Sequence, residues 1–240
     1  MRMKSGIMVL GIILVFAAPI SAAPLLQVDI GGNFATGAPS QVVQPGWENF
    51  YLHELGGGSG STSYTYGAIT QKISTTIYGA TVGYTFDTGP YPGVTIPDVY
   101  DDAAVGNAYG NGGGMKIEFS GLTAGQQYSV EMWHWSANRG GVNVDWYDDS
   151  IGHVLIGNFA TAGALPTSDT DYKDTFLAIA NSSGELIFSA SVGPSAPVGV
   201  FSVNGLRLTA VPEPSTMLLL GSGLAGLVGL VVFGRKRLKK

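Results

Sequence analysis

Residues 115–133 have the sequence MKIEFSGLTAGQQYSVEMW, in which two alternating runs of apolar and polar residues flank a short segment. Gly121 and Gly125 interrupt the pattern between the two runs. Alternation with a period of two is typical of strands that bury one face. We therefore interpret the stretch as two strands joined in a hairpin. Residues 176–192, FLAIANSSGELIFSASV, repeat the pattern and turn at 181–184.

Short alternating stretches continue from Leu25 to residue 209, separated by clusters of Gly, Asn, Ser, Asp and Pro. No segment of useful length has the 3.6-residue period of an amphipathic helix, and the run GGGSGS at 56–61 is typical of a flexible loop. This pattern predicts an all-β fold, a β-sandwich of two packed sheets. The predicted strands are 26–30, 73–78, 82–86, 115–119, 127–135, 142–147, 153–156, 175–180, 185–192 and 200–209.

The composition agrees with a β-rich domain, because Gly (36 residues) and Tyr (11 residues) are frequent and only 12% of residues are charged. Between residues 24 and 210, five basic residues stand against sixteen acidic ones, a net charge of −11 with His neutral. Nucleic acid is therefore not an expected partner, since binding to phosphates requires positive charge. The chain has no Cys, which excludes disulfides, thiolate metal sites and a Cys nucleophile.

Residues 1–23 have the three parts of a secretory signal peptide. The segment MRMK is basic, residues 7–18 are apolar, and PISAAP at 19–24 supplies small residues around a cleavage site near Ala22 or Ala23. The apolar part is shorter than the roughly twenty residues that a membrane-spanning helix needs. This favours a signal peptide over the alternative, an uncleaved anchor, and predicts export across the inner membrane.

The C-terminal end combines an apolar run with a basic tail. Residues 217–233 carry no charge and have the minimum length of a transmembrane helix. By the positive-inside rule, the tail at 234–240 stays in the cytoplasm. Pro212 and Pro214 hold the preceding segment extended and accessible. The basic residues of the tail are Arg235, Lys236, Arg237, Lys239 and Lys240.

The motif VPEPST at 211–216, the short apolar helix and the basic end together resemble the PEP-CTERM sorting signal of Gram-negative bacteria that make extracellular polysaccharide. The resemblance implies that an exosortase, an integral membrane transpeptidase, recognises the Pro-Glu-Pro motif and removes the tail. It also implies a transient membrane-anchored stage, followed by delivery to the cell surface or extracellular matrix. The alternative is a permanent C-terminal anchor with a proline-rich stalk. The motif residues are Val211, Pro212, Glu213, Pro214, Ser215 and Thr216.

The expected organisation is a signal peptide at 1–23, a β-sandwich domain at 24–210 and a sorting signal at 211–240. Within residues 25–209, the predicted hairpin and the strand FSVNGLRL at 201–208 resemble jelly-roll domains of the galactose-binding and malectin-like type. This resemblance implies a jelly-roll-like sandwich. It implies no ligand, because the chain has no matching set of sugar-binding residues.

Two tryptophans share one face of the strand predicted at 127–135. Alternation places Ser129, Glu131, Trp133 and Trp135 on one face, and Tyr128, Val130, Met132 and His134 on the other. With Trp146 and Tyr147 from the next predicted strand, the two indoles are candidates for a platform that stacks on sugar rings. The alternative is that these aromatic residues fill the buried face of a sandwich.

Acidic residues recur in predicted loops, most densely in SDTDYKD at 168–174. Asp169, Asp171 and Asp174 are candidate calcium ligands, because closely spaced carboxylates supply the oxygen atoms that calcium prefers. The sequence of a calcium-binding EF-hand loop is absent. Solvated acids in turns are the alternative interpretation, so no cofactor is predicted apart from this candidate structural calcium.

Catalytic patterns are weak. Glu118 and Glu131, on neighbouring strands of the predicted hairpin, are a candidate carboxylate pair for glycoside cleavage, and outward-facing polar residues are the alternative. His53, His134 and His153 have no metal-binding spacing, and no G-x-S-x-G motif is present. We therefore predict a non-enzymatic surface or matrix protein, a binding or structural component associated with exopolysaccharide. The alternatives are a carbohydrate-binding module with an aromatic platform or a polysaccharide-cleaving enzyme.

Overall fold

The computed structural model describes residues 23–32, 43–52, 61–75, 82–86, 91–109, 115–135, 143–149, 154–160, 164–192 and 198–212. Residues 23–213 form a unit of their own. The predicted signal sequence and the predicted helix at 217–233 lie outside the described residues. Within the described ranges, no helix has the length and apolar character needed to cross a membrane.

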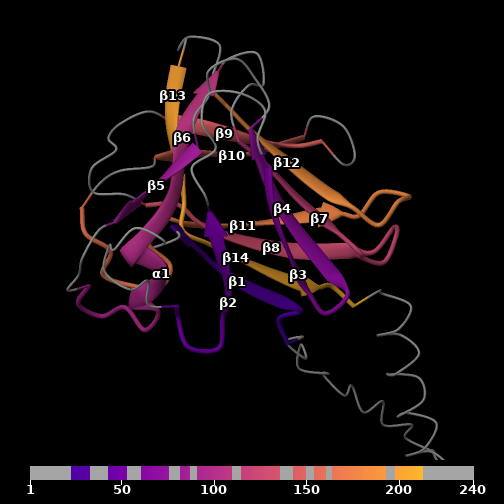
Figure 1. Cartoon of the computed structure of the whole chain (residues 1–240), viewed down its shortest axis with the longest axis horizontal. Helices are drawn as coiled ribbons and strands as arrows, with labels where there is room; N and C mark the ends of the chain where they lie inside the picture. Colours follow the sequence, from indigo (N-terminus) through magenta and orange to yellow (C-terminus); the bar gives the residue numbers. More distant parts are fainter. Residues whose placement is uncertain are drawn as a thin grey trace, which may run out of the picture. The chain divides into compact units, whose positions relative to one another are not determined.

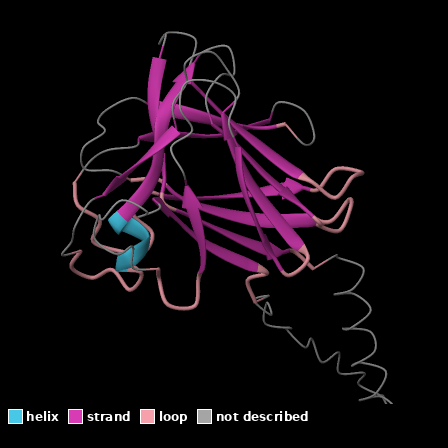
Figure 2. Ribbon diagram, viewed as in Figure 1, coloured by secondary structure: helices cyan, strands magenta, loops and turns pink. Residues whose placement is uncertain are grey.

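Most of the described residues are in β-strands, and the single helix among them is short (Figure 2). This confirms the predicted all-β fold class. The helix is α1 (Pro97–Asp101). The strands are β1 (Leu26–Gly32), β2 (Glu48–Leu52), β3 (Ser61–Tyr66), β4 (Ile69–Thr75), β5 (Val82–Phe86), β6 (Asp102–Tyr109), β7 (Met115–Ser120), β8 (Gln127–Trp133), β9 (Asn143–Asp148), β10 (Val154–Ala160), β11 (Lys173–Ile179), β12 (Leu186–Val192), β13 (Val198–Val203) and β14 (Gly205–Ala210).

The strands form two large sheets and one small one (Figure 1). A five-stranded sheet has the order β11-β8-β14-β1-β2, and a six-stranded sheet has the order β10-β9-β12-β7-β4-β3. The small sheet has the order β13-β6-β5. All pairs are antiparallel except β1 with β2. The five- and six-stranded sheets pack face to face, as expected for a sandwich.

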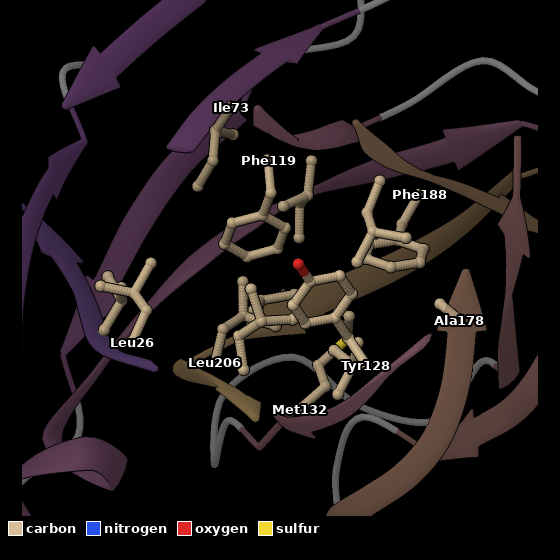
Figure 3. Packing of buried hydrophobic residues seen from close by; sticks show 14 of the residues in the cluster. Leu26, Ile73, Phe119, Tyr128, Met132, Ala178, Phe188 and Leu206 are labelled. Carbon is tan, nitrogen blue, oxygen red and sulfur yellow. The ribbon is translucent and has the colours of Figure 1, made fainter. Parts of the chain in front are cut away.

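The main hydrophobic cluster lies between these two sheets, and both contribute side chains to it (Figure 3). In β7, and in β8 as far as Met132, buried residues alternate with partly exposed ones, so the period-two pattern of the sequence correctly identifies the inward faces. The cluster includes Leu26, Val28, Tyr128, Val130, Met132, Leu206 and Leu208 from the five-stranded sheet, and Ile73, Ile117, Phe119, Leu186 and Phe188 from the six-stranded sheet.

Both predicted hairpins are wrong in the same way. β7 belongs to the six-stranded sheet and β8 to the five-stranded sheet, so residues 121–126 cross from one sheet to the other. β11 and β12 are likewise in different sheets, joined by residues 180–185. The two crossing segments bond to each other, from Leu122 N to Gly184 O at 3.0 Å and from Gly125 N to Ala180 O at 2.9 Å. In each of the two cases, the consecutive strands lie in opposite sheets, and their inward faces pack against the same hydrophobic core.

Each predicted strand overlaps an observed one, but the predicted strand at 200–209 is divided at Asn204 into β13 and β14. Asn204 N donates to Trp133 O at 2.9 Å, and its side-chain oxygen accepts from Trp135 N. These bonds turn the chain from the small sheet into the five-stranded sheet. The sequence analysis missed β2, β3, β6 and α1, and β3 begins at Ser61, the last residue of the predicted flexible loop.

Substitution of Gly121 by Ala is expected to destabilise the domain strongly. Gly121 has φ of 80°, and an added Cβ would overlap the carbonyl oxygen of Ala68 in the turn between β3 and β4. We expect a loss of at least about 2 kcal/mol in the free energy of unfolding, measured by urea denaturation. Gly125→Ala is the matched control, because φ is 75° there and no atom lies within 4 Å of the added Cβ. It should cost only about 1 kcal/mol, and equal losses in the two variants would contradict the steric argument.

Candidate functional site

The outer face of the five-stranded sheet carries the polar and aromatic residues that the sequence analysis singled out. Tyr128, Val130 and Met132 of β8 point into the main hydrophobic cluster, so Glu131 and Trp133 lie on the opposite face. The predicted alternation along this strand is therefore confirmed. What the sequence does not reveal is that other segments cover one end of this outer face.

Trp133 and Trp135 are buried in a second hydrophobic cluster, called here the aromatic cluster. It consists of Tyr91, Val99, Tyr100, Trp133 and Trp135. Both indoles are only 1% exposed. The ring centroid of Trp135 lies 5.6 Å from that of Tyr91 and 6.4 Å from that of Tyr100, with the rings edge to face. Such edge-to-face pairs are a favoured aromatic geometry.

Hydrogen bonds attach the covering segments to this cluster. The indole nitrogen of Trp133 donates to Asp169 O at 2.9 Å, and the hydroxyl of Tyr100 donates to Asp171 O at 2.7 Å. Residues 91–101, which include α1, and residues 164–172 thus close over the end of β8. The two tryptophans are packing residues and do not offer an exposed platform for sugar stacking.

Trp146 and Tyr147 do not join the two tryptophans either. Trp146 is 1% exposed and belongs to the main hydrophobic cluster. Tyr147, the next residue along β9 in the six-stranded sheet, is half-buried. The burial of Trp146 agrees with the packing alternative, because a sandwich fills its inward face with large side chains. Tyr147 points to the opposite, outer face of the same strand.

Beside the aromatic cluster lies a charged group of residues, called here the Arg207 cluster, which consists of Gln27, Trp47, Glu131, Lys173 and Arg207. Arg207 Nη1 donates to Glu131 Oε2 at 2.9 Å, and Arg207 Nε donates to Gln27 Oε1 at 2.8 Å. Lys173 Nζ pairs with the other oxygen of Glu131 at 2.5 Å. The register of β14, β8 and β1 brings these residues together, since Arg207 lies opposite both Glu131 and Gln27.

Trp47, which the sequence analysis did not single out, completes the Arg207 cluster. The guanidinium carbon of Arg207 lies 5.2 Å from the ring centroids of Trp47 and of Trp133. The two indoles meet edge to face, with their centroids 5.3 Å apart. Arg207 therefore lies against two aromatic faces, which stabilise a cation. No motif marks Trp47, because it lies in a turn outside the alternating strands.

The Arg207 cluster keeps Glu131 ionised. Burial raises the pKa of Glu131, but the hydrogen bonds and charges of Lys173 and Arg207 outweigh it, so the pKa lies below its ordinary value. A carboxylate whose pKa is lowered by folding stabilises the native state above its unfolded pKa. That contribution is lost as the pH falls through the lowered value. One carboxylate thus links β11, β8 and β14 at ordinary pH.

Glu131→Gln is expected to lower the free energy of unfolding by roughly 1 to 3 kcal/mol at pH 7, because two cations lose a charged acceptor. Glu118→Gln is the matched control. Glu118 of β7 also lies between two cations, but Lys72 and Lys116 are 3.7 Å away and Lys72 is 40% exposed, so its loss should cost less than about 1 kcal/mol.

The measurement is urea denaturation between pH 7 and pH 3. Below the ordinary pKa of glutamate, about 4.3, the wild type should lose stability more steeply than Glu131→Gln, which lacks the titrating group. Parallel pH profiles for the two proteins would contradict a lowered pKa of Glu131.

The carboxylates of the candidate calcium ligands accept hydrogen bonds from backbone N–H groups and hydroxyls of nearby residues. The carboxylate of Asp169 accepts from the backbone and side chain of Thr95, and one of its oxygens accepts from Thr95 N at 2.6 Å. Asp171 accepts from Thr167 N at 2.8 Å and from the hydroxyl of Ser168 at 2.9 Å. The bonds from Thr167 and Ser168 hold the pKa of Asp171 below its ordinary value. Among the described residues, no three acidic or His side chains are grouped for a metal ion.

A thermal experiment can test the candidate calcium site in this loop. Because a calcium ion would have to replace the hydrogen bonds that Asp169 and Asp171 already accept, we expect excess chelator to leave the melting temperature unchanged. A lower melting temperature in chelator, restored by calcium in the wild type but not in Asp171→Asn, would contradict this expectation and support a structural site.

The candidate carboxylate pair for glycoside cleavage is not brought together. Glu118 lies on β7 of the six-stranded sheet, between inward-facing Ile117 and Phe119, and therefore faces outward. Glu131 faces outward from the five-stranded sheet. The two carboxylates lie on opposite outer surfaces of the sandwich, whereas glycoside cleavage needs two carboxyl groups within about 10 Å. The expectation that they lie on paired strands is wrong, because β7 and β8 are in different sheets.

One comparison concerns the C-terminal end. Residues 210–237 match the family model of the PEP-CTERM protein-sorting motif. The resemblance inferred from VPEPST, the apolar run and the basic tail is thereby confirmed. The sandwich domain lies outside this match, and no curated protein sequence matches the chain.

Solved structures with some similarity include a family 35 carbohydrate-binding module from Clostridium thermocellum, at 15% identity and a TM-score of 0.34, covering 63% of this chain and 99% of that one. The ANXUR2 extracellular domain from Arabidopsis thaliana matches at 12% identity and a TM-score of 0.40, covering 80% and 49%. A carbohydrate-binding module from Cellvibrio mixtus lichenase 5A, in complex with cellotriose, matches at 13% identity and a TM-score of 0.22, covering 67% of this chain and 91% of that one. These scores are too low to indicate a shared ligand.

The PEP-CTERM motif begins where the last strand ends. Ala210, the first matched residue, is the last residue of β14. The next residue, Val211, still donates from its N–H to Gln127 O at 2.9 Å, and its carbonyl oxygen accepts from the side-chain amide of Gln126. The sorting motif therefore follows the fold with no intervening linker, and the strand ladder holds its first residues extended.

Proposed function

We propose that the chain is exported and delivered to the cell surface or extracellular matrix, where it acts as a non-catalytic binding or structural component associated with exopolysaccharide. An exosortase-type transpeptidase is the proposed partner for processing. The chain is anchored in the membrane by residues 217–233 until the tail is removed. The observation that carries this proposal is the PEP-CTERM sorting motif at 210–237.

The geometry of the sandwich supports a role without catalysis. Glu131, on the outer face of the five-stranded sheet, is paired with Lys173 and Arg207. The carboxylates of Glu118 and Glu131 face away from each other, so these two residues cannot act together as the acid and base of a polysaccharide-cleaving mechanism. Burial of Trp133 and Trp135 removes the support for a platform at these positions, so association with polysaccharide requires another surface.

Alteration of the motif is expected to block sorting in a host that encodes an exosortase. The test compares the wild type with a variant in which Pro212, Glu213 and Pro214 are all Ala, each with an epitope tag inserted after residue 24 and a second tag after residue 240. The wild type should lose the C-terminal tag and appear in the surface and polysaccharide fractions. The variant should keep both tags and remain in the inner membrane, because its apolar segment still spans the bilayer.

Replacement of Ser182 and Ser183 by Ala is the control, since both residues are exposed in a turn and lie outside the matched motif. A wild-type chain that stays in the cytoplasm with both tags would overturn the proposed export and sorting. A processed chain that is washed from the surface without polysaccharide would overturn the association with exopolysaccharide alone.

A further inference from the structure

A polar pocket lies at the edge of the five-stranded sheet, beside the Arg207 cluster. Its volume is about 340 Å³, which is near the lower end of the range for small-molecule sites, about 300 to 1,000 Å³. The pocket is lined by Pro24, Leu25, Leu26, Gln27, Gly46, Glu48, Tyr66 and Gly67. These residues come from the start of β1, the start of β2 and the turn between β3 and β4.

The sheet topology explains why space is left here. β1 pairs with β14 from Leu26 onward, but its pairing with β2 begins only at Val28, opposite Glu48. The first residues of β1 therefore have β14 on one side and no partner strand from β2 on the other. Tyr66 and Gly67 reach this gap from the six-stranded sheet and form its far wall.

The polar groups of the pocket are held in place by neighbouring residues. The Gln27 side-chain oxygen accepts from Arg207 Nε at 2.8 Å, which orients its amide nitrogen toward Gly46 O, 3.5 Å away. The hydroxyl of Tyr66 donates to Asn49 O at 2.6 Å. Burial and the charge of Glu48 raise the pKa of Tyr66, so the hydroxyl keeps its proton. Arg207 is thus a positioning residue for this pocket.

We propose that this pocket binds one neutral hexopyranose unit of a polysaccharide. The inference rests on the proposed association with exopolysaccharide and names the surface and the sugar class. Glu48 is the one charged side chain in the lining, so an acidic sugar or a phosphate would be repelled. Its carboxylate accepts hydrogen bonds from sugar hydroxyls, the Gln27 amide donates one, and Pro24 and Leu25 contact the apolar ring face.

Two glycines allow the pocket to be filled without disturbing the fold. Gly46 has φ of 83° and Gly67 has φ of 62°, and a Cβ added at either would meet no atom within 4 Å. Asn tolerates this backbone region, so Gly46→Asn and Gly67→Asn should place a side chain in the binding space. Gly125→Asn is the matched control, with φ of 75°, open space and no part in the lining.

The test is an NMR titration of the isotope-labelled full chain in micelles of a phosphocholine detergent, whose headgroup contains no sugar. The probes are methyl glucoside, methyl galactoside, methyl mannoside and glucuronate. At least one neutral glycoside should shift the backbone amide signals of Gln27, Gly46 and Gly67, and glucuronate should bind more weakly. Gly67→Asn, Gly46→Asn and Glu48→Gln should each weaken binding by about tenfold or more, with Gly125→Asn unchanged.

Equal urea midpoints for the three Asn variants establish that any difference lies in binding. Tighter binding of glucuronate, or an equal loss in Gly125→Asn, would overturn the inference and leave the proposed function in place. If no probe binds while the processed chain still fractionates with polysaccharide, the inference about the pocket is also overturned and the proposed function stands. Absence of both binding and fractionation would overturn the inference together with the association with exopolysaccharide.

Discussion

The pairing of β14 between β1 and β8 is the contact on which the rest of the domain depends. β14 is the last strand among the described residues, yet it lies in the centre of the five-stranded sheet and joins β1 to β8. Leu26 pairs with Leu208 across almost the whole domain, and such distant pairing carries a large loop-closure entropy before any contact is gained. The five-stranded sheet can therefore form only after residues up to 210 are available.

The same strand places the charged and polar groups that matter outside the core. Arg207 extends from the outer face of β14 and contacts Glu131 on one neighbouring strand and Gln27 on the other. Through Gln27, the position of β14 determines the orientation of an amide that lines the edge pocket. Formation of the last strand thus completes the sheet, the Arg207 cluster and the wall of the pocket in one step.

The fold class could be predicted from sequence because the inward faces of β7, β8 and β12 alternate strictly, which needs only local information. The pairing of β7 with β8 and of β11 with β12 could not be judged from sequence. A short polar loop with glycines can join two strands of one sheet or strands of two different sheets, and its local sequence does not distinguish the two cases. For Trp133 and Trp135, periodicity correctly indicated a shared face. Their burial depends on residues 91–101 and 164–172, which are distant in sequence and carry no strand pattern. Gly46 and Gly67 line a pocket only because β2 starts late relative to β1.

The distribution of charge restricts how such a domain can associate with a polysaccharide. On each large sheet, one glutamate lies between two cations: Glu131 between Lys173 and Arg207, and Glu118 between Lys72 and Lys116. Four of the five basic residues between 24 and 210 are therefore neutralised in part by these two acids.

The remaining acidic residues give the domain a strongly negative net charge, which repels acidic polymers within a Debye length of about 8 Å at physiological salt. Long-range attraction by charge to an acidic matrix is thus unfavourable, and the basic residues that the structure describes between 24 and 210 already have acidic partners. The proposed association with polysaccharide therefore depends on short-range hydrogen bonds and apolar contacts, as in the pocket at the sheet edge. For that reason, the pocket with Glu48 among neutral and apolar residues is a better candidate for sugar recognition than the surfaces that carry the paired cations.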